Sequence, residues 1–235
     1  MTGLDTLIHL DKELLLVLNG SASLYLDGVV KTLTTASTWI PLYLSLFYLV
    51  VKNNDSVQKI VLILGCAGLC VLLCDAVCTN IVKPGVGRWR PTHDEEIGAL
   101  VDIVNGYRGG RFGFFSGHAS NTFSIAVFFC WLVRSRLLSF GLITWSLVNC
   151  WTRLYLGVHF PGDILVGLLY GAAVGSLVYY LYVRISRCLL TKSNFISSFY
   201  TSTGYQKDDI DIVILVLVLT FLYALLRACF YLYVY

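Results

Sequence analysis

Residues 57–79 read VQKIVLILGCAGLCVLLCDAVCT, an apolar run in which Lys59 and Asp75 are the only charged residues. A helix of about 20 such residues is long enough to cross a hydrocarbon core of about 30 Å. Similar runs recur along the chain and predict six spans, at residues 28–51, 57–79, 117–133, 137–156, 162–183 and 211–233. We therefore expect an all-α fold, a polytopic membrane bundle of about six helices.

The composition of the whole chain agrees with this expectation. Of the 235 residues, 57% are hydrophobic and 13% are charged, and the mean hydropathy is +0.74. An ordinary soluble domain carries about 25% charged residues, so the composition excludes a soluble globular protein. The net charge of +3 is scattered along the chain, and the sequence therefore predicts no binding of nucleic acid.

The predicted organisation is a single membrane-embedded domain over residues 1–235. Charged residues recur between the leucines of residues 4–18, a pattern typical of an amphipathic helix in the membrane interface. No basic stretch precedes this segment, so we expect no secretory signal. Residues 80–116 form the predicted active-site loop and residues 184–210 a cytoplasmic loop, and the span at 211–233 is an additional C-terminal element.

The loops between the spans predict the orientation in the membrane. Lys52, Arg134 and Arg184 belong to loops on one side, which the positive-inside rule places in the cytoplasm. Residues 80–116 and the polar segment 153–163 then face outward from the plasma membrane, or from the inner membrane if the protein is bacterial. The basic residues of these outer segments oppose this assignment unless they bind an anion.

Two polar elements lie on the predicted outer side near the second and third spans. The first has Lys83 and Arg90 separated by six residues and followed by Pro91. The second is Ser116-Gly117-His118, directly before an apolar run. Ser116 suits the N-cap of the following helix, which would leave free backbone amides and the positive end of the helix facing the loop. This arrangement is typical of anion binding.

The third polar element runs from Thr152-Arg153 to Asp163. Pro161 suits the first position of a helix, so His159 is expected just outside the helix and Asp163 one turn inside. The carboxylate could accept the Nδ1–H of the imidazole and leave Nε2 free to attack. Each element alone has a structural explanation. Together they unite histidines, a carboxylate, cations and a helix N-terminus, which fits phosphoryl transfer.

With these spacings, residues 80–183, together with the preceding interfacial helix and the first span, resemble the phosphatidic acid phosphatase type 2 family, membrane lipid phosphatases related to the vanadium haloperoxidases. The signature of that family is Lys, six residues, Arg-Pro; then Pro-Ser-Gly-His; then Ser-Arg, five residues, His, three residues, Asp. This chain has Phe115 in place of the proline and Thr152 in place of the serine. The six principal polar positions are all present at the expected intervals.

The resemblance implies a role for each of these residues. His159 would be the nucleophile that takes the phosphoryl group, and Asp163 would orient it. His118 would protonate the leaving alcohol and later activate water. The residues that would hold the phosphate oxygens are Lys83, Arg90, Ser116, Gly117 and Arg153. Because the cations neutralise the phosphate, no metal and no other cofactor is expected.

The expected function is hydrolysis of a lipid phosphate at the outer face of the membrane. The expected partners are this lipid substrate and the membrane lipids that surround the protein. The candidate substrates are undecaprenyl diphosphate, phosphatidylglycerophosphate, phosphatidic acid and lipid A. The alternative is a lipid phosphotransferase on the same scaffold, in which a second lipid accepts the phosphoryl group. A transporter is less favoured, because the polar residues cluster at one face and no pair of broken helices repeats. Asp75 and Arg227, charged residues within spans, are expected to need partners.

Overall fold

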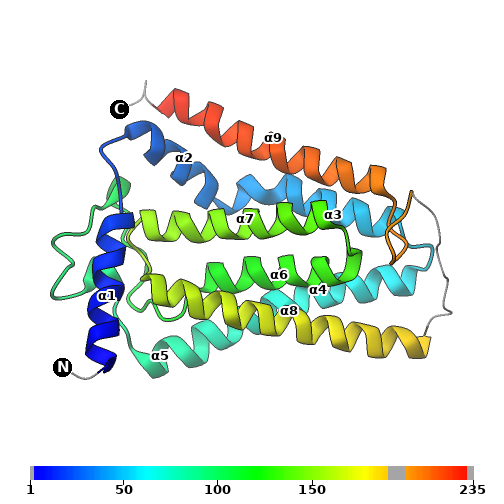
Figure 1. Cartoon of the computed structure of the whole chain (residues 1–235), viewed down its shortest axis with the longest axis horizontal. Coiled ribbons are helices and arrows are strands. Elements are labelled where there is room, and N and C mark those ends of the chain that lie inside the picture. Colours follow the sequence, from blue (N-terminus) through cyan, green and yellow to red (C-terminus); the bar gives the residue numbers. More distant parts are fainter. Residues whose placement is uncertain (1–2, 190–198, 232–235) are drawn as a thin grey trace.

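The computed structural model describes residues 3–189 and 199–231, and their regular elements are helices joined by loops. The α-helices are α1 (Gly3–Leu18), α2 (Leu24–Thr34), α3 (Ile40–Lys52), α4 (Val57–Val77), α5 (Lys83–Val86), α6 (Gly117–Val133), α7 (Arg136–Tyr155), α8 (Pro161–Leu189) and α9 (Lys207–Tyr231). Short helical turns are η1 (Ala36–Trp39), η2 (Cys78–Val82), η3 (Pro91–His93) and η4 (Val104–Gly106). The long helices lie side by side in one bundle (Figure 1).

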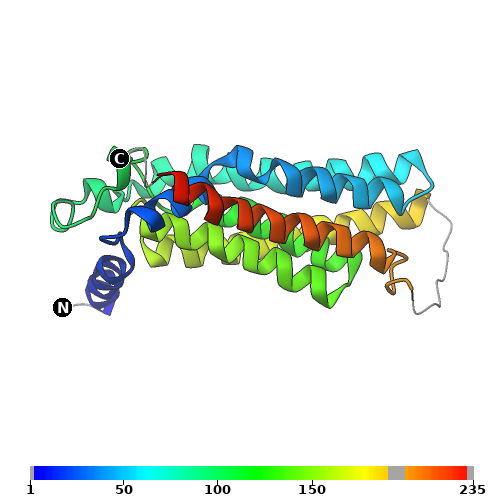
Figure 2. The same ribbon diagram turned by 90° about the horizontal axis from the view of Figure 1, so that it is seen from above.

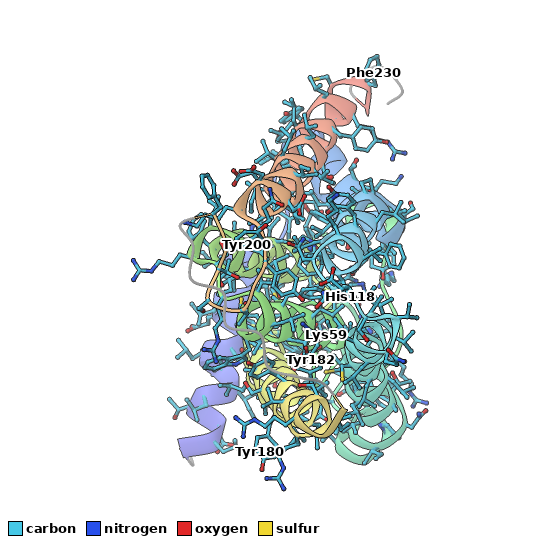
Figure 3. All side chains as sticks on the ribbon, turned by 90° about the vertical axis from the view of Figure 1, so that its right-hand side faces the viewer. Lys59, His118, Tyr180, Tyr182, Tyr200 and Phe230 are labelled. Atoms are coloured by element: carbon cyan, nitrogen blue, oxygen red, sulfur yellow. The ribbon has the colours of Figure 1, made fainter. Side chains whose placement is uncertain are left out.

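A helix or a bent pair of helices lies at each of the six predicted spans, which confirms the polytopic helical bundle. Within the described residues, three helices are long and apolar enough to cross a membrane, namely Val57–Val86, Pro161–Arg187 and Lys207–Phe230. A fourth span is possible if Leu24–Thr34 and Ala36–Lys52, which meet at an angle of 67°, count as one. Large apolar side chains cover the outside of the bundle, as Tyr180 and Phe230 do in the end-on view of Figure 3.

The centre of the bundle is α6, which packs against α4, α7 and α8. The most extensive contact of α6 is with α8, and it depends on glycine. A Cβ atom on Gly171 would lie 2.6 Å from the backbone oxygen of Ser120, and one on Gly175 would lie 2.5 Å from that of Ser124. Small residues spaced four apart let two membrane helices come into backbone contact. This contact holds the start of α8 beside the start of α6.

Helices α4, α8 and α9 extend beyond their predicted limits. The span predicted to end at residue 79 continues from α4 through a π-helical turn, η2, and through α5, and it ends where Gly87 adopts a φ of +64°. Lys83 therefore lies on a helix and not in a loop. Similarly, α8 continues to Leu189 and α9 begins at Lys207, so less of the predicted loop 184–210 is non-helical than expected. Residues 190–198 of that loop lie outside the described residues.

The amphipathic helix predicted at residues 4–18 is present as α1. It lies across one end of the bundle at a steep angle to the other helices, as Figures 1 and 2 agree. Leu15 of α1 is fully buried in a cluster with Ile97, Val101 and Phe160. Lys12 of α1 lies 2.9 Å from Asp94 and 2.7 Å from Glu96. The helix is thus docked on the loop between α5 and α6 by both apolar and ionic contacts.

Candidate active site

The three polar elements come together at the end of the bundle where α1 lies. The backbone N–H of Ser116, at the start of α6, donates a hydrogen bond of 3.0 Å to the carbonyl of Asp163 on α8. Figure 3 places His118 near the axis of the bundle. The charges that act on His118 include those of Arg153, Arg90 and Lys83, and His159 is also near. The predicted site residues are therefore neighbours, although they are distant in the sequence.

The predicted position of His159 and Asp163 relative to α8 is confirmed, because the helix begins at Pro161. His159 is 2% exposed and Asp163 is 0% exposed. The His159 Nδ1 atom lies 3.5 Å from the Asp163 Oδ2 atom, too far for a well-formed hydrogen bond. The same Oδ2 accepts a hydrogen bond of 3.0 Å from the backbone N–H of Phe160. Asp163 therefore caps its own helix while it faces the imidazole.

The surroundings of His159 favour its neutral form. Burial lowers the pKa of His159 to about 4; the contact with Asp163 opposes this shift, and the charge of Arg90 adds to it. An imidazole with a pKa of about 4 is uncharged near neutral pH. One of its ring nitrogens then carries no proton and is available as a base or as a nucleophile.

Arg90 and Lys83 line a cavity of about 320 Å³. Arg90 is held in place because its Nε donates to the Phe112 carbonyl at 3.1 Å and Nη1 donates to the Val158 carbonyl at 3.3 Å. Burial lowers the pKa of Arg90, and the positive charge of Arg153 lowers it further. An anion bound between these cations would relieve that repulsion. A third cation, Arg111, also lines the cavity, and sequence reasoning assigned it no specific role.

Arg153 approaches the site from α7 and is 2% exposed. One guanidinium nitrogen donates to the hydroxyl of Thr34, and another donates to the Tyr107 hydroxyl at 3.1 Å. Its Nε is buried and has no hydrogen-bond partner in the part of the chain that the structure describes. Thr34 and Tyr107 also line a second cavity of about 300 Å³, together with Lys31. Arg153 therefore lies beside this second cavity.

Ser116 caps α6 as predicted, since its Oγ accepts from the backbone N–H of Ala119 at 3.4 Å. The Ser116 side chain is fully buried, whereas His118, in the first turn, is exposed. The hydroxyl of Ser116 therefore serves the helix, and any contact of the Ser116-Gly117 segment with an anion would come from the backbone. This refines the sequence prediction, which did not separate side chain from backbone.

Sequence reasoning missed Arg88, which contacts Asp163, and Asp11, which contacts Arg88. Arg88 Nη1 donates to Asp163 Oδ1 at 2.8 Å, and Arg88 Nη2 donates to Asp11 Oδ2 at 2.7 Å. The position of Arg88 inside the first motif was the one available signal. Asp11 lies on the interfacial helix, and nothing in the sequence connected it to the site.

The charged residues inside predicted spans have contacts on their own helices. The Asp75 carboxylate is exposed on α4 and lies 3.5 Å from the hydroxyl of Thr79. Arg227 is exposed on α9 and donates to the Tyr223 hydroxyl at 3.2 Å. Each contact joins two residues that are four positions apart on one helix. Both contacts therefore follow from helix geometry rather than from packing against a neighbouring helix.

Comparison with known proteins gives a consistent result. Residues 60–187 match the PAP2 superfamily. A lipid A 4'-phosphatase of Bacteroides thetaiotaomicron is 39% identical over 179 residues, which cover 76% of this chain and 79% of that protein. A lipid A 4'-phosphatase of Porphyromonas gingivalis is 35% identical over 186 residues, which cover 77% of each chain. No solved structure matches.

The match spans α4 to α8 and includes all three motifs, so it covers the elements that form the site. The family predicted from the motifs is confirmed, and with it the enzyme class, a phosphoric ester hydrolase. The chain belongs to the PAP2 superfamily.

Proposed function

We propose that this protein removes a phosphate group from lipid A through a phosphohistidine intermediate. The observation that carries the proposal is the buried pair of His159 and Asp163, with the charges of Arg90 and Arg153 acting on His159 and that of Lys83 acting on His118. Lipid A is the first choice among the candidate lipids because the two relatives named above, at 35–39% identity, are lipid A 4'-phosphatases.

In the first half of the reaction, Nε2 of His159 attacks the phosphorus atom, and the bond from phosphorus to the lipid oxygen breaks. His118 in its protonated form gives its proton to that oxygen, so the lipid leaves as an alcohol. Asp163 stabilises the positive charge that develops on the His159 ring. Its position near Nδ1 supports this role, because the other ring nitrogen is then the nucleophile.

In the second half, His118, now neutral, takes a proton from water as the water oxygen attacks the phosphohistidine. The bond from phosphorus to Nε2 breaks, and inorganic phosphate leaves. Lys83, Arg90 and Arg153 stabilise the charge on the equatorial oxygens in both steps. Because these cations supply the positive charge, the proposal requires no metal ion.

We also propose that the site faces the outside of the plasma membrane, which is the inner membrane in a bacterium. The site, α1 and the loop between α5 and α6 lie at one end of the bundle (Figure 1). The basic residues Lys52, Arg134 and Arg136 lie in or beside the connections at the opposite end. The positive-inside rule therefore supports an outward-facing site.

The test is phosphate release by the purified protein in detergent from lipid A, phosphatidic acid, phosphatidylglycerophosphate and undecaprenyl diphosphate. We expect lipid A to have the highest kcat/KM, and His159→Ala to abolish turnover on every lipid. A higher kcat/KM for another lipid would overturn the choice of substrate. Transfer of the phosphate to a second lipid without release of inorganic phosphate would favour the phosphotransferase alternative.

A further inference from the structure

We propose that Asp11 and Arg88 are positioning residues that hold the Asp163 carboxylate in its orientation toward His159. Helix α1 then contributes to the active site through Asp11. We call the contacts from Asp11 through Arg88 to Asp163 the Asp11–Arg88 link. The inference rests on the proposed function, because it takes His159 and Asp163 as the nucleophile and its partner.

Other groups hold the Asp163 carboxylate more firmly than His159 does. Oδ1 accepts from Arg88 at 2.8 Å and Oδ2 accepts from the Phe160 N–H at 3.0 Å, whereas the His159 Nδ1 atom is 3.5 Å away. Asp163 is fully buried, so water does not replace either donor. The orientation of the carboxylate relative to the imidazole is therefore set by Arg88 and by the start of α8.

Arg88 is itself held in place by α1. Its other guanidinium nitrogen donates to Asp11 Oδ2 at 2.7 Å, and the guanidinium carbon lies 4.0 Å from the centre of the Phe160 ring. Asp11 Oδ1 accepts from the Gly162 N–H at 2.7 Å. Asp11 therefore contacts both Arg88 and the first turn of α8, the helix that carries Asp163.

Asp11 approaches α8 so closely that a larger residue at position 162 would displace the Asp11 carboxylate. A Cβ atom on Gly162 would lie 2.9 Å from Asp11 Oδ2. The link also bridges segments distant in sequence, since Arg88 is separated from Asp11 by 77 positions and from Asp163 by 75. Such a contact forms only when α1, the loop and α8 are all in place.

The link has an electrostatic signature that mere support of the fold would lack. The charged and titratable groups around His159 come from every packed element: Asp163 on α8, Arg153 on α7, His118 on α6, Lys83 on α5, Arg90 and Arg88 in the following loop, and Asp11 on α1 behind Arg88. Arg88 weakens the attraction of Asp163 for a protonated His159, and Asp11 weakens the effect of Arg88.

Removing the two charges should therefore shift the titration of His159 in opposite directions. Without the positive charge, in Arg88→Gln, Asp163 attracts the imidazolium more strongly and the pKa of His159 rises. Without the negative charge, in Asp11→Asn, Arg88 is no longer neutralised and the pKa of His159 falls. The acid limb of the kcat/KM profile should move to higher pH in Arg88→Gln and to lower pH in Asp11→Asn, each by about 0.5–1 pH unit.

The experiment compares the pH dependence of kcat and KM for the purified full chain on lipid A and on phosphatidic acid. The control is Lys12→Gln, because Lys12 docks α1 on Asp94 and Glu96 without touching Arg88 or Asp163. We expect kcat to fall about 10- to 100-fold in Asp11→Asn and Arg88→Gln, the loss typical when a hydrogen-bond partner that orients a functional group is removed, with little change in KM. Arg88→Lys should restore part of the loss, and Lys12→Gln should leave the acid limb unmoved.

The inference is wrong if the acid limbs of Asp11→Asn and Arg88→Gln stay at the wild-type pH or move in the same direction. It is also wrong if the acid limb of Lys12→Gln shifts as that of Asp11→Asn does. Melting temperatures identify a variant that fails to fold, and if Arg88→Gln does so, Asp11→Asn and Arg88→Lys still decide the question. Release of phosphate from phosphatidic acid but not from lipid A would overturn the proposed substrate alone, since the profiles can be compared on phosphatidic acid.

Discussion

Replacing Asp163 by asparagine tests the role of this carboxylate with almost no change of shape. Both carboxylate oxygens accept from donors, Oδ1 from Arg88 at 2.8 Å and Oδ2 from the Phe160 N–H at 3.0 Å. An asparagine has one oxygen and one NH2 group, so one of these donors must face another donor. Because Asp163 is fully buried, we expect this mismatch to cost about 1–3 kcal/mol of stability.

The two possible orientations of the new amide side chain in Asp163→Asn would each harm catalysis. If the NH2 group faces Phe160 and His159, Nδ1 must accept a hydrogen bond, and the proton then sits on Nε2, the atom that attacks. If the NH2 group faces Arg88 instead, the guanidinium loses its partner on α8. By analogy with the wrong-tautomer effect in serine proteases, we expect kcat to fall about 10⁴-fold.

The assay is steady-state phosphate release from lipid A, with thermal unfolding measured in parallel. The matched control is Asp102→Asn, because Asp102 is an exposed carboxylate in the loop between α5 and α6. The control should retain wild-type kcat and stability. An Asp163→Asn variant that folds and keeps kcat within tenfold of the wild type would refute the tautomer argument.

Further predictions concern the histidines, the metal, the topology and the helix contact. His159→Ala should abolish the acid-labile phosphoprotein, and phosphate labelling of this variant would show that another residue is the nucleophile. His118→Ala should lower kcat by about 10²–10⁴, and the loss should be smaller for p-nitrophenyl phosphate, whose leaving group needs little protonation. Activity should survive EDTA and be inhibited by vanadate, and a loss restored by magnesium would contradict the assignment of charge neutralisation to the cations. An impermeant thiol reagent on intact cells should label a cysteine substituted for Glu95 and not one for Asp55, and the reverse result would invert the topology. Gly171→Ala should lower the melting temperature, because its Cβ would lie 2.6 Å from the Ser120 oxygen, while an unchanged melting temperature would mean that α8 moves away at no cost.

The sequence predicted those features of the site that depend on local structure. Ser116 caps α6, Pro161 begins α8, and four residues separate His159 from Asp163, all within one or two helical turns. Hydropathy predicted the spans because burial in lipid demands long apolar runs. Such local rules suffice to place each motif at the end of a helix.

The remaining features depend on packing between segments that are distant in the sequence. The extension of α4 through η2 to Gly87 was not predicted, because a π-helical turn has no clear pattern in a run of apolar residues. The contact of Asp11 with Arg88 depends on where α1 docks, which apolar periodicity does not specify. Sequence reasoning had also assigned Asp163 to His159 alone, whereas Arg88 shares it.

The two departures from the family signature can be understood from where their side chains lie. Thr152 Oγ1 donates to the Asn149 carbonyl at 2.7 Å on its own helix, so its hydroxyl is already bound by backbone. Phe115 is buried with its ring 5.0 Å from that of Tyr170, so it packs between helices. Neither side chain supplies a charge or a proton to His159. Exchange of proline for phenylalanine and of serine for threonine therefore changes the packing behind the motifs, while the groups proposed to act on phosphate stay at their expected intervals.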